Sequence, residues 1–137
     1  MSPQEARAFV ERVFEPVNAG RFEDYNHDVT AGFVSHGPRG DMDSEGMKKL
    51  HMMVRSGLPD WHLVVEDAFS CGDRVGVRGT FRGTHRGTFM GKAPTGKLLE
   101  WRYIALWRIS GGKVAEEWFL DDDLGLQQQL GVIPRAG

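Results

Sequence analysis

The sequence lacks the features that define several large functional classes. A single cysteine, Cys71, excludes an internal disulfide framework and any zinc site built from several cysteines. No apolar run approaches the roughly 20 residues of a membrane-spanning helix. The N-terminus also lacks the apolar segment of a secretory signal. These absences favour a protein of the reducing cytoplasm, with no membrane partner.

The net charge gives no sign of a nucleic-acid or membrane partner. The formal charge is only −2, which provides no general attraction to nucleic acid or to anionic membranes. Basic side chains gather between Arg74 and Lys97, and acidic ones between Glu116 and Asp123. No series of aromatic residues accompanies the basic stretch, as single-strand binding would require. We therefore expect a solvated sheet face there, and no nucleic-acid partner.

Common catalytic and metal-binding motifs are missing as well. The five histidines form no H-x-x-x-H or H-E-x-x-H pair, so a metal site is not expected. The sequence has no phosphate-binding loop, no dinucleotide fingerprint and no G-x-S-x-G nucleophile motif. Cys71 falls in a tight Cys-Gly-Asp turn with no evident base, which favours an inert thiol.

The first half of the sequence has helical periodicity. Ser2, Pro3 and Glu5 form a capping box, and an apolar stripe from Phe9 to Val17 predicts a helix that Gly20 ends. A short helix is expected at 21–26, followed by a short extended segment, FVSHGPRGD. A second helix begins near Ser44, and Gly57 and Pro59 terminate it; its apolar face carries Met47, Leu50, His51 and Val54.

After Pro59 the apolar period changes from 3.6 toward 2. Four antiparallel strands are predicted at 61–70, 74–85, 97–109 and 113–122, with a Gly-rich loop between the second and third. A short closing helix follows at 123–130. Helices first and an antiparallel sheet afterwards predict an α+β fold, in one domain over residues 1–137.

The last predicted strand carries the most chemical information. Period 2 places Asp122 on one face with Trp118 and Leu120, whereas Asp121 falls on the other face. A carboxyl beside an indole in a water-poor hollow has a raised pKa and can act as general acid or base. The competing interpretation is that residues 121–123 simply begin and cap the closing helix.

Other polar and aromatic residues leave two interpretations open. Aromatic side chains are concentrated on the predicted strands, where they form either a closed core or the wall of a pocket: Trp61, Phe81, Trp101, Tyr103, Trp107 and Trp118. His51 lies on an apolar helix face and is more typical of a core histidine. His36 precedes a Gly-Pro break, at a loop where polar groups often meet ligands. His85 ends a strand beside the Gly-rich loop.

Taken in order, several segments resemble the SnoaL-like polyketide cyclases of the NTF2-like superfamily. The segments are CGDRVGVRGTFRGTHRGTFMG, APTGK and WRISGGKVAEEWFLDDDLGLQQQLGVIP in the second half. VNAGRFEDY, FVSHGP and LPDWHL match more loosely in the first half. The resemblance implies a curved sheet wrapped by helices around a conical pocket.

The family resemblance also implies chemistry. Such cyclases close a ring by an intramolecular aldol reaction on an aromatic β-keto ester, with an aspartate as acid and base and without a cofactor. The resemblance places this role on Asp122. Trp118, Tyr103 and Trp61 would wall the pocket, with His36, His51 or His85 near the substrate. One departure is that the strand EWRYIALWRI lacks the histidine that the cyclases carry there.

Alternatives remain open at this stage. One buried carboxylate serves isomerisation, dehydration or epoxide hydrolysis as well as cyclisation. A non-catalytic ligand-binding or dimerisation module would show a pocket filled by aromatic side chains and an exposed Asp122. Ile104 and Leu106 alternate with Arg102 and Arg108 on the predicted outer face of a strand, which suits a sheet-to-sheet homodimer. The expected ligand is a small aromatic or apolar molecule.

Overall fold

In the computed structural model of the chain, which describes residues 1–135, the first helix forms as the capping box predicts. Helix α1 spans Pro3–Asn18. The Ser2 hydroxyl accepts a hydrogen bond from the Glu5 amide at 3.1 Å, and the Glu5 carboxylate accepts one from the Ser2 amide at 2.7 Å. The apolar stripe of α1 is buried. Gly20, at φ +76°, provides the left-handed turn that leads the chain away.

The segment between the two long helices is more ordered than the sequence indicates. A 3₁₀ helix η1 covers Phe22–His27, and a hairpin follows with strands β1 (Val29–Gly37) and β2 (Gly40–Met42). Helix α2 spans Ser44–Gly57. Asp43 caps α2, since its carboxylate accepts a hydrogen bond from the Gly46 amide at 2.8 Å.

Four long strands and a short helix complete the chain, each within two residues of its predicted bounds. They are β3 (His62–Cys71), β4 (Arg74–Thr84), β5 (Leu98–Ser110), β6 (Lys113–Asp121) and α3 (Asp123–Leu130). No helix within residues 1–135 is long and apolar enough to cross a membrane.

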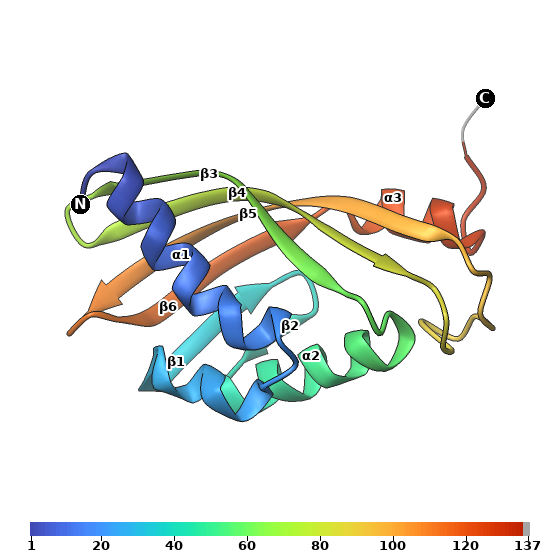
Figure 1. Cartoon of the computed structure of the whole chain (residues 1–137), viewed down its shortest axis with the longest axis horizontal. Coiled ribbons are helices and arrows are strands. Elements are labelled where there is room, and N and C mark those ends of the chain that lie inside the picture. The colour runs from blue at the N-terminus through green and yellow to red at the C-terminus, as the bar shows by residue number, and fades with distance from the viewer. Residues whose placement is uncertain (136–137) are drawn as a thin grey trace.

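The strands form one mixed sheet in the order β2-β1-β6-β5-β4-β3. Every neighbouring pair is antiparallel except β1 and β6, which are parallel. Figure 1 shows α1 and α2 on the same side of this twisted sheet, with α3 near its far end. The α+β class predicted from the order of the elements is thus confirmed.

A β-bulge in β6 controls which side chains point inward. At the turn, Ser110 pairs with Lys113 and Ile109 with Val114, but the next pair is Arg108 with Glu116. Ala115 is therefore the extra residue. Because strand side chains alternate, one extra residue exchanges the two faces of all that follows. Glu117, Phe119 and Asp121 consequently lie on the same face of the sheet as the aromatic row of β5.

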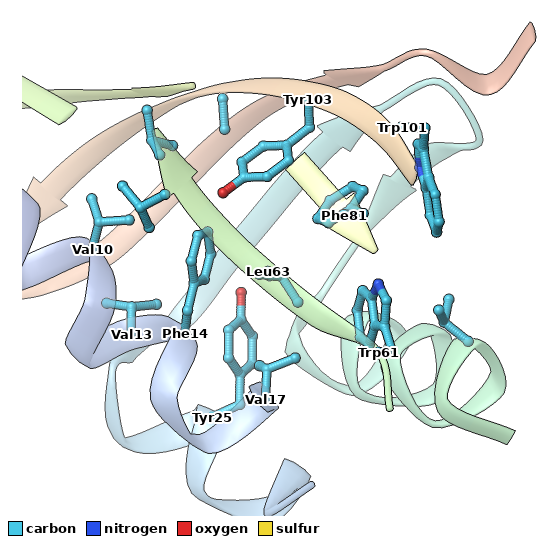
Figure 2. Close-up of a cluster of buried hydrophobic side chains, with 14 of the residues drawn as sticks. Val10, Val13, Phe14, Val17, Tyr25, Trp61, Leu63, Phe81, Trp101 and Tyr103 are labelled. Atoms are coloured by element: carbon cyan, nitrogen blue, oxygen red, sulfur yellow. The ribbon is translucent and has the colours of Figure 1, made fainter. Parts of the chain in front are cut away.

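The core lies between the concave face of the sheet and the helices. Figure 2 shows Val10, Val13 and Phe14 of α1 pointing into the core, where Phe14 lies near Tyr103 of β5. Phe81 and Tyr103 stack with their ring centroids 4.4 Å apart, and Phe14 meets Trp107 edge to face at 5.5 Å. The helices therefore close one end of the concave face against aromatic rings.

Candidate functional site

The concave face of the sheet does not close completely on the helices. A cavity of about 120 Å³, open at its mouth, remains between β1, β4–β6 and α2. Its wall is mainly aromatic and aliphatic, with a few polar groups that converge on the space. This combination is typical of small-molecule sites. The polar side chains of the lining are Tyr25, Ser35, Arg39, His51, Trp61, Trp101, Tyr103, Glu117 and Asp121.

Asp121 supplies a carboxylate to this cavity. Its Oδ2 accepts a hydrogen bond from the Trp101 indole nitrogen at 3.1 Å, whereas its buried Oδ1 has no partner. Burial raises the pKa of Asp121, and the charge of nearby Arg39 partly opposes this effect. The result is a desolvated carboxyl, held in place through one oxygen, with the other free to take a proton.

His51 and Trp61 place two further unpartnered polar atoms on the cavity wall. The Nδ1 of His51 and the Nε1 of Trp61 are buried without a hydrogen bond, and their rings lie 5.8 Å apart. Burial lowers the pKa of His51 to about 4, so the imidazole is neutral at pH 7. An indole N–H donates only, whereas a neutral imidazole nitrogen donates or accepts according to its tautomer. Together they suit a carbonyl or hydroxyl oxygen.

Tyr103 and its aromatic neighbours shape the flat wall of the cavity. The Tyr103 hydroxyl donates to the Val64 carbonyl at 3.1 Å, and burial raises the pKa of the phenol. Figure 2 shows Phe81 between Tyr103 and Trp101, with Trp61 facing this group. Because the Tyr103 hydroxyl is already bonded, this side chain acts as a wall rather than as an acid.

A second carboxyl, Glu117, also lines the cavity. Its Oε1 lies 2.6 Å from the Ser35 hydroxyl, and its Oε2 accepts from the Trp107 indole at 2.7 Å. Ser35 on β1 and Trp107 on β5 are its register partners on either side. Burial raises the pKa of Glu117, and the two hydrogen bonds only partly oppose this effect.

The structure contradicts the expectation that Asp122 faces the hollow. Asp122 is exposed and caps α3, accepting a hydrogen bond from the Gly125 amide at 3.0 Å. The physical reason is the bulge at Ala115, which turns Asp121 inward and Asp122 outward. The competing interpretation, a helix cap, describes Asp122 correctly, and the carboxylate of the cavity is its neighbour.

Trp118 and His36 both lie outside the cavity, Trp118 because of the bulge and His36 because it alternates with the inward-facing Ser35 on β1. They stack on the outer face of the sheet with ring centroids 5.5 Å apart. The His36 imidazole bridges Glu116, at 2.7 Å, and Asp41, at 2.9 Å. The hydrogen bond to Glu116 is the main cause of a raised His36 pKa. Neither residue lines the space beside Asp121.

His85 is buried but does not line the cavity. Its Nδ1 accepts from the Thr95 amide at 3.3 Å and lies 3.0 Å from the Thr95 hydroxyl. The ring packs against Phe89, which does line the cavity. The structure thus brings Trp61, Tyr103 and His51 together, and leaves Asp122, His36, His85 and Trp118 elsewhere.

Sequence reasoning missed Asp121, Glu117 and Ser35 as cavity residues. A usable signal was present in β5, whose alternation correctly identifies Trp101, Tyr103, Ala105 and Trp107 as inward-facing. Pairing β6 to this row would identify its inner face, but only if the bulge were known. No group of three or more His, Cys, Asp or Glu side chains within residues 1–135 is arranged to hold a metal ion.

Fold and site together define an α+β protein with a mainly apolar cavity between a mixed six-stranded sheet and its helices. The SnoaL-like polyketide cyclase model matches residues 4–130. The chain therefore belongs to the SnoaL-like polyketide cyclase family, and its fold is that of the NTF2-like SnoaL structures. No curated protein matches the sequence significantly.

Three solved structures illustrate the likeness. AclR of Streptomyces galilaeus, a proposed hydroxylase, is 28% identical, with TM-score 0.88 and coverage of 99% of this chain and 87% of AclR. IdmH of Streptomyces antibioticus, a proposed polyketide cyclase, is 28% identical, with TM-score 0.81 and coverage of 96% and 99%. A proposed polyketide cyclase of Bacillus cereus is 31% identical, with TM-score 0.78 and coverage of 91% and 79%.

Proposed function

We propose that this chain is a cofactor-independent enzyme that removes a proton next to a carbonyl in a flat, apolar ketone or keto ester. Asp121 is the general base and then the general acid, and ring closure by an intramolecular aldol reaction is the favoured outcome. The observation that carries the proposal is the Asp121 carboxyl, with one oxygen fixed by Trp101 and the other unpartnered in an aromatic cavity.

The cavity favours this chemistry in two ways. Desolvation makes the Asp121 carboxylate a stronger base, bringing its pKa toward that of an acidified C–H. The unpartnered nitrogens of Trp61 and His51 suit a substrate oxygen. Because His51 is neutral, no full positive charge lies beside that oxygen. A ligand that bonds these buried atoms would also remove their desolvation cost.

The proposed reaction balances without a co-reactant. The Asp121 carboxylate takes the α-proton, and the electrons of the broken C–H bond form an enolate. The enolate carbon attacks a second carbonyl of the same molecule, so that one C–C bond forms and that carbonyl becomes an alkoxide. The protonated Asp121 then returns its proton to the alkoxide, which restores the carboxylate.

Two adjacent carboxylates provide a matched test of this assignment. The protein is incubated in heavy water with aryl β-keto esters, and exchange at the α-carbon is followed above the buffer rate. Asp121→Asn should reduce the catalysed exchange by about 10²–10⁴-fold, the usual contribution of a placed acid-base group. Asp122→Asn should leave it unchanged, since asparagine also caps a helix. Full exchange in Asp121→Asn would overturn the assignment.

Hydroxylation is a second candidate, favoured by the likeness to AclR. The two reactions differ in product mass, because an aldol closure keeps the composition of the substrate, whereas hydroxylation inserts one oxygen atom from dioxygen and uses two electrons from a reductant to turn the other into water. Mass spectrometry of the products therefore separates them. Isomerisation, dehydration and epoxide hydrolysis remain alternatives that use the same carboxylate.

A non-catalytic binding module remains the alternative from another class. The exposed Asp122 agrees with such a module. The module also predicts a pocket filled by aromatic side chains, however, and the cavity beside the desolvated Asp121 is not filled. Tight binding of aryl ketones without any Asp121-dependent exchange would favour that module over an enzyme.

A further inference from the structure

The lining of the cavity divides into a buried part and a partly exposed part. Its aromatic side chains are buried, apart from Phe119, and form the inner wall. The methionines of the lining, in contrast, are all partly exposed. A side chain that borders the cavity and also meets solvent lies toward the opening. We call these four residues the methionine collar: Met42, Met47, Met53 and Met90.

Three separate segments contribute to the methionine collar. One methionine comes from β2, two come from α2, and Met90 comes from the loop between β4 and β5. Of the six methionines in the sequence, only Met1 and Met52 lie outside the lining. Met52 is next to Met53 on α2 and is 50% exposed. One residue type thus converges on one opening from elements that are distant in the sequence.

Met90 takes a backbone conformation that does not suit a methionine. Phe89 and Lys92 are joined by two backbone hydrogen bonds, of 3.0 and 2.9 Å, so that Met90 and Gly91 form a two-residue turn. Their φ angles are +49° and +76°, values that favour Asn-Gly in such a turn. Among residues 1–135, Met90 is the only non-glycine residue with a positive φ. Backbone strain of this kind is concentrated at functional sites.

The loop that carries Met90 is fixed to the end of α2. The Gly57 carbonyl accepts hydrogen bonds from the amides of Arg86 and Gly87, at 3.1 and 3.0 Å. The two backbones lie so close that a Cβ added at Gly87 would be 2.3 Å from the Ser56 carbonyl oxygen. These contacts hold the turn in place, so Met90 borders the cavity although its own backbone preference opposes the conformation.

Methionine differs from the buried part of the lining in its freedom to adapt. Its side chain is unbranched, has three rotatable bonds and a polarisable sulfur, and fills irregular spaces. The aromatic rings of the inner wall are rigid and pack against one another, as the stacked pair of Phe81 and Tyr103 shows. The cavity therefore combines an inner wall of fixed shape with an opening of variable shape.

We propose that the methionine collar adapts to the ligand, changing rotamers to close the opening around molecules of different shape, and that the strained turn is kept because it completes the collar. The inner wall then determines which core of a ligand fits, and the collar tolerates variation in the substituents that project toward solvent. This inference rests on the proposed use of the cavity as the substrate site, but it does not depend on the acid-base role of Asp121.

Nuclear magnetic resonance of methionine methyl groups tests the collar directly. The protein carries ¹³C-methyl methionine and the Asp121→Asn substitution, so that bound esters are not turned over. The probes are ethyl benzoylacetate and tert-butyl benzoylacetate, which share the aryl ketone and differ in the ester group. The collar methyl signals should shift on saturation with each ester and reach different positions with the two. Met52 should not respond. Binding that leaves the collar signals unmoved would overturn the proposal.

Affinity measurements test whether this adaptation sets selectivity. A fixed pocket discriminates a single methylene by about 10–200-fold, so the wild-type ratio of the two dissociation constants should stay below about tenfold. The triple variant Met42→Leu, Met47→Leu, Met53→Leu keeps the apolar volume but has fewer rotatable bonds. Its ratio should rise by about tenfold, whereas Met52→Leu should leave the ratio unchanged. An equal ratio in the wild type and the triple variant would exclude adaptation by the collar.

The strained turn has its own matched pair of variants. Met90→Asn suits the left-handed turn and removes the apolar side chain, so both esters should bind about fivefold more weakly while the thermal unfolding midpoint does not fall. Met90→Leu should keep both affinities. A lower midpoint with unchanged binding in Met90→Asn would show that Met90 only packs against the core. Failure of both esters to bind would overturn the collar, whereas Asp121-dependent exchange tests the proposed function separately.

Discussion

At the scale of single residues, the cavity is marked by polar atoms that the protein itself does not satisfy. Asp121 Oδ1, His51 Nδ1 and Trp61 Nε1 are all buried and unpartnered. Each such atom costs about 1–3 kcal/mol relative to a hydrogen-bonded one. Three of them along the wall of one cavity support the proposed binding of a polar-substituted ligand there.

His51 makes this cost measurable through pH. Its pKa is about 4 in the folded chain, against 6.5 when exposed. The unfolded chain therefore binds a proton between pH 6.5 and 4 that the folded chain does not, so stability falls as pH falls through that window. The loss amounts to about 3 kcal/mol.

Urea unfolding at pH 7.5 and at pH 4.5 checks this prediction. His51→Gln cannot titrate, so its free energy of unfolding should fall less than that of the wild type between the two values. Carboxylates that titrate in the same range are common to both proteins and cancel in the difference. An equal loss in both would mean that His51 is already solvated in the folded state.

At the scale of secondary-structure elements, the positions of helices and strands are predicted more accurately from the sequence than the residues of the cavity are. Capping residues and apolar periods located α1, α2, α3 and the four long strands. The inner face of β5 followed from its alternation, because one face is mainly aromatic and the other mixes charged with aliphatic residues. β6 lacks such contrast: Trp118 and Leu120 are exposed, at 38% and 68%, although they are the larger apolar residues.

There is a second reason why the inward-facing side of β6 could not be predicted from the local residue pattern. A bulge costs little locally, leaves no distinctive residue at Ala115, and reverses every later side chain. The carboxylate was expected at Asp122 because the face of Trp118 and Leu120 was interpreted as the inner one, whereas these two side chains are exposed. His51 and Trp61 do line the cavity, His51 from the buried face of α2 and Trp61 from the residue just before β3.

Gly76 and Gly79 of β4 differ in the atoms that an added Cβ would meet. A Cβ at Gly79 would lie 2.1 Å from the Val64 carbonyl oxygen and 2.3 Å from the Tyr103 hydroxyl. Backbone cannot move aside cheaply, and this approach lies beside the bulge between Val65 and Asp67 of β3. At Gly76 the new atom would meet only the Phe69 ring, at 2.8 Å, and that side chain is largely exposed.

Gly79→Ala should therefore destabilise the fold by about 2 kcal/mol or more, as overpacking of a core does, and should weaken aryl ketone binding by displacing Tyr103. Gly76→Ala should cost well under half as much. Chemical unfolding of the two variants, with ligand binding measured alongside, makes the comparison. Equal costs would show that strand conformation, not the contact with Tyr103, decides the effect.

At the scale of the whole molecule, the two faces of the sheet have different roles. The concave face holds the cavity, and the outer face presents an apolar patch formed by Ile104, Leu106, Trp118 and Leu120. Ile104 is opposite Leu120, and Leu106 is opposite Trp118, across the β5–β6 pair. Arginines and glutamates border the patch, among them the Arg108–Glu116 and Arg82–Glu100 ion pairs.

We propose that this patch packs against the same patch of a second copy. A two-fold interface joins identical surfaces, so the apolar centre would meet itself while charges of both signs at its border remain near water. Ile104 and Leu120 are 63% and 68% exposed in one chain, and contiguous apolar surface of this kind marks interaction sites. The dimer would leave both cavities open, because they face away from it.

Light scattering after size-exclusion chromatography tests the dimer directly. The wild type should elute with twice the mass of one chain at micromolar concentration, and Ile104→Lys should shift it to the monomer by placing two charges at the two-fold contact. Met52→Lys is the matched control, since Met52 is 50% exposed on α2, on the other side of the sheet. A monomeric wild type, or a dimer that survives Ile104→Lys but not Met52→Lys, would exclude this face. Because the active cavity lies on the opposite face, the monomeric Ile104→Lys variant should keep its Asp121-dependent exchange, which separates assembly from catalysis.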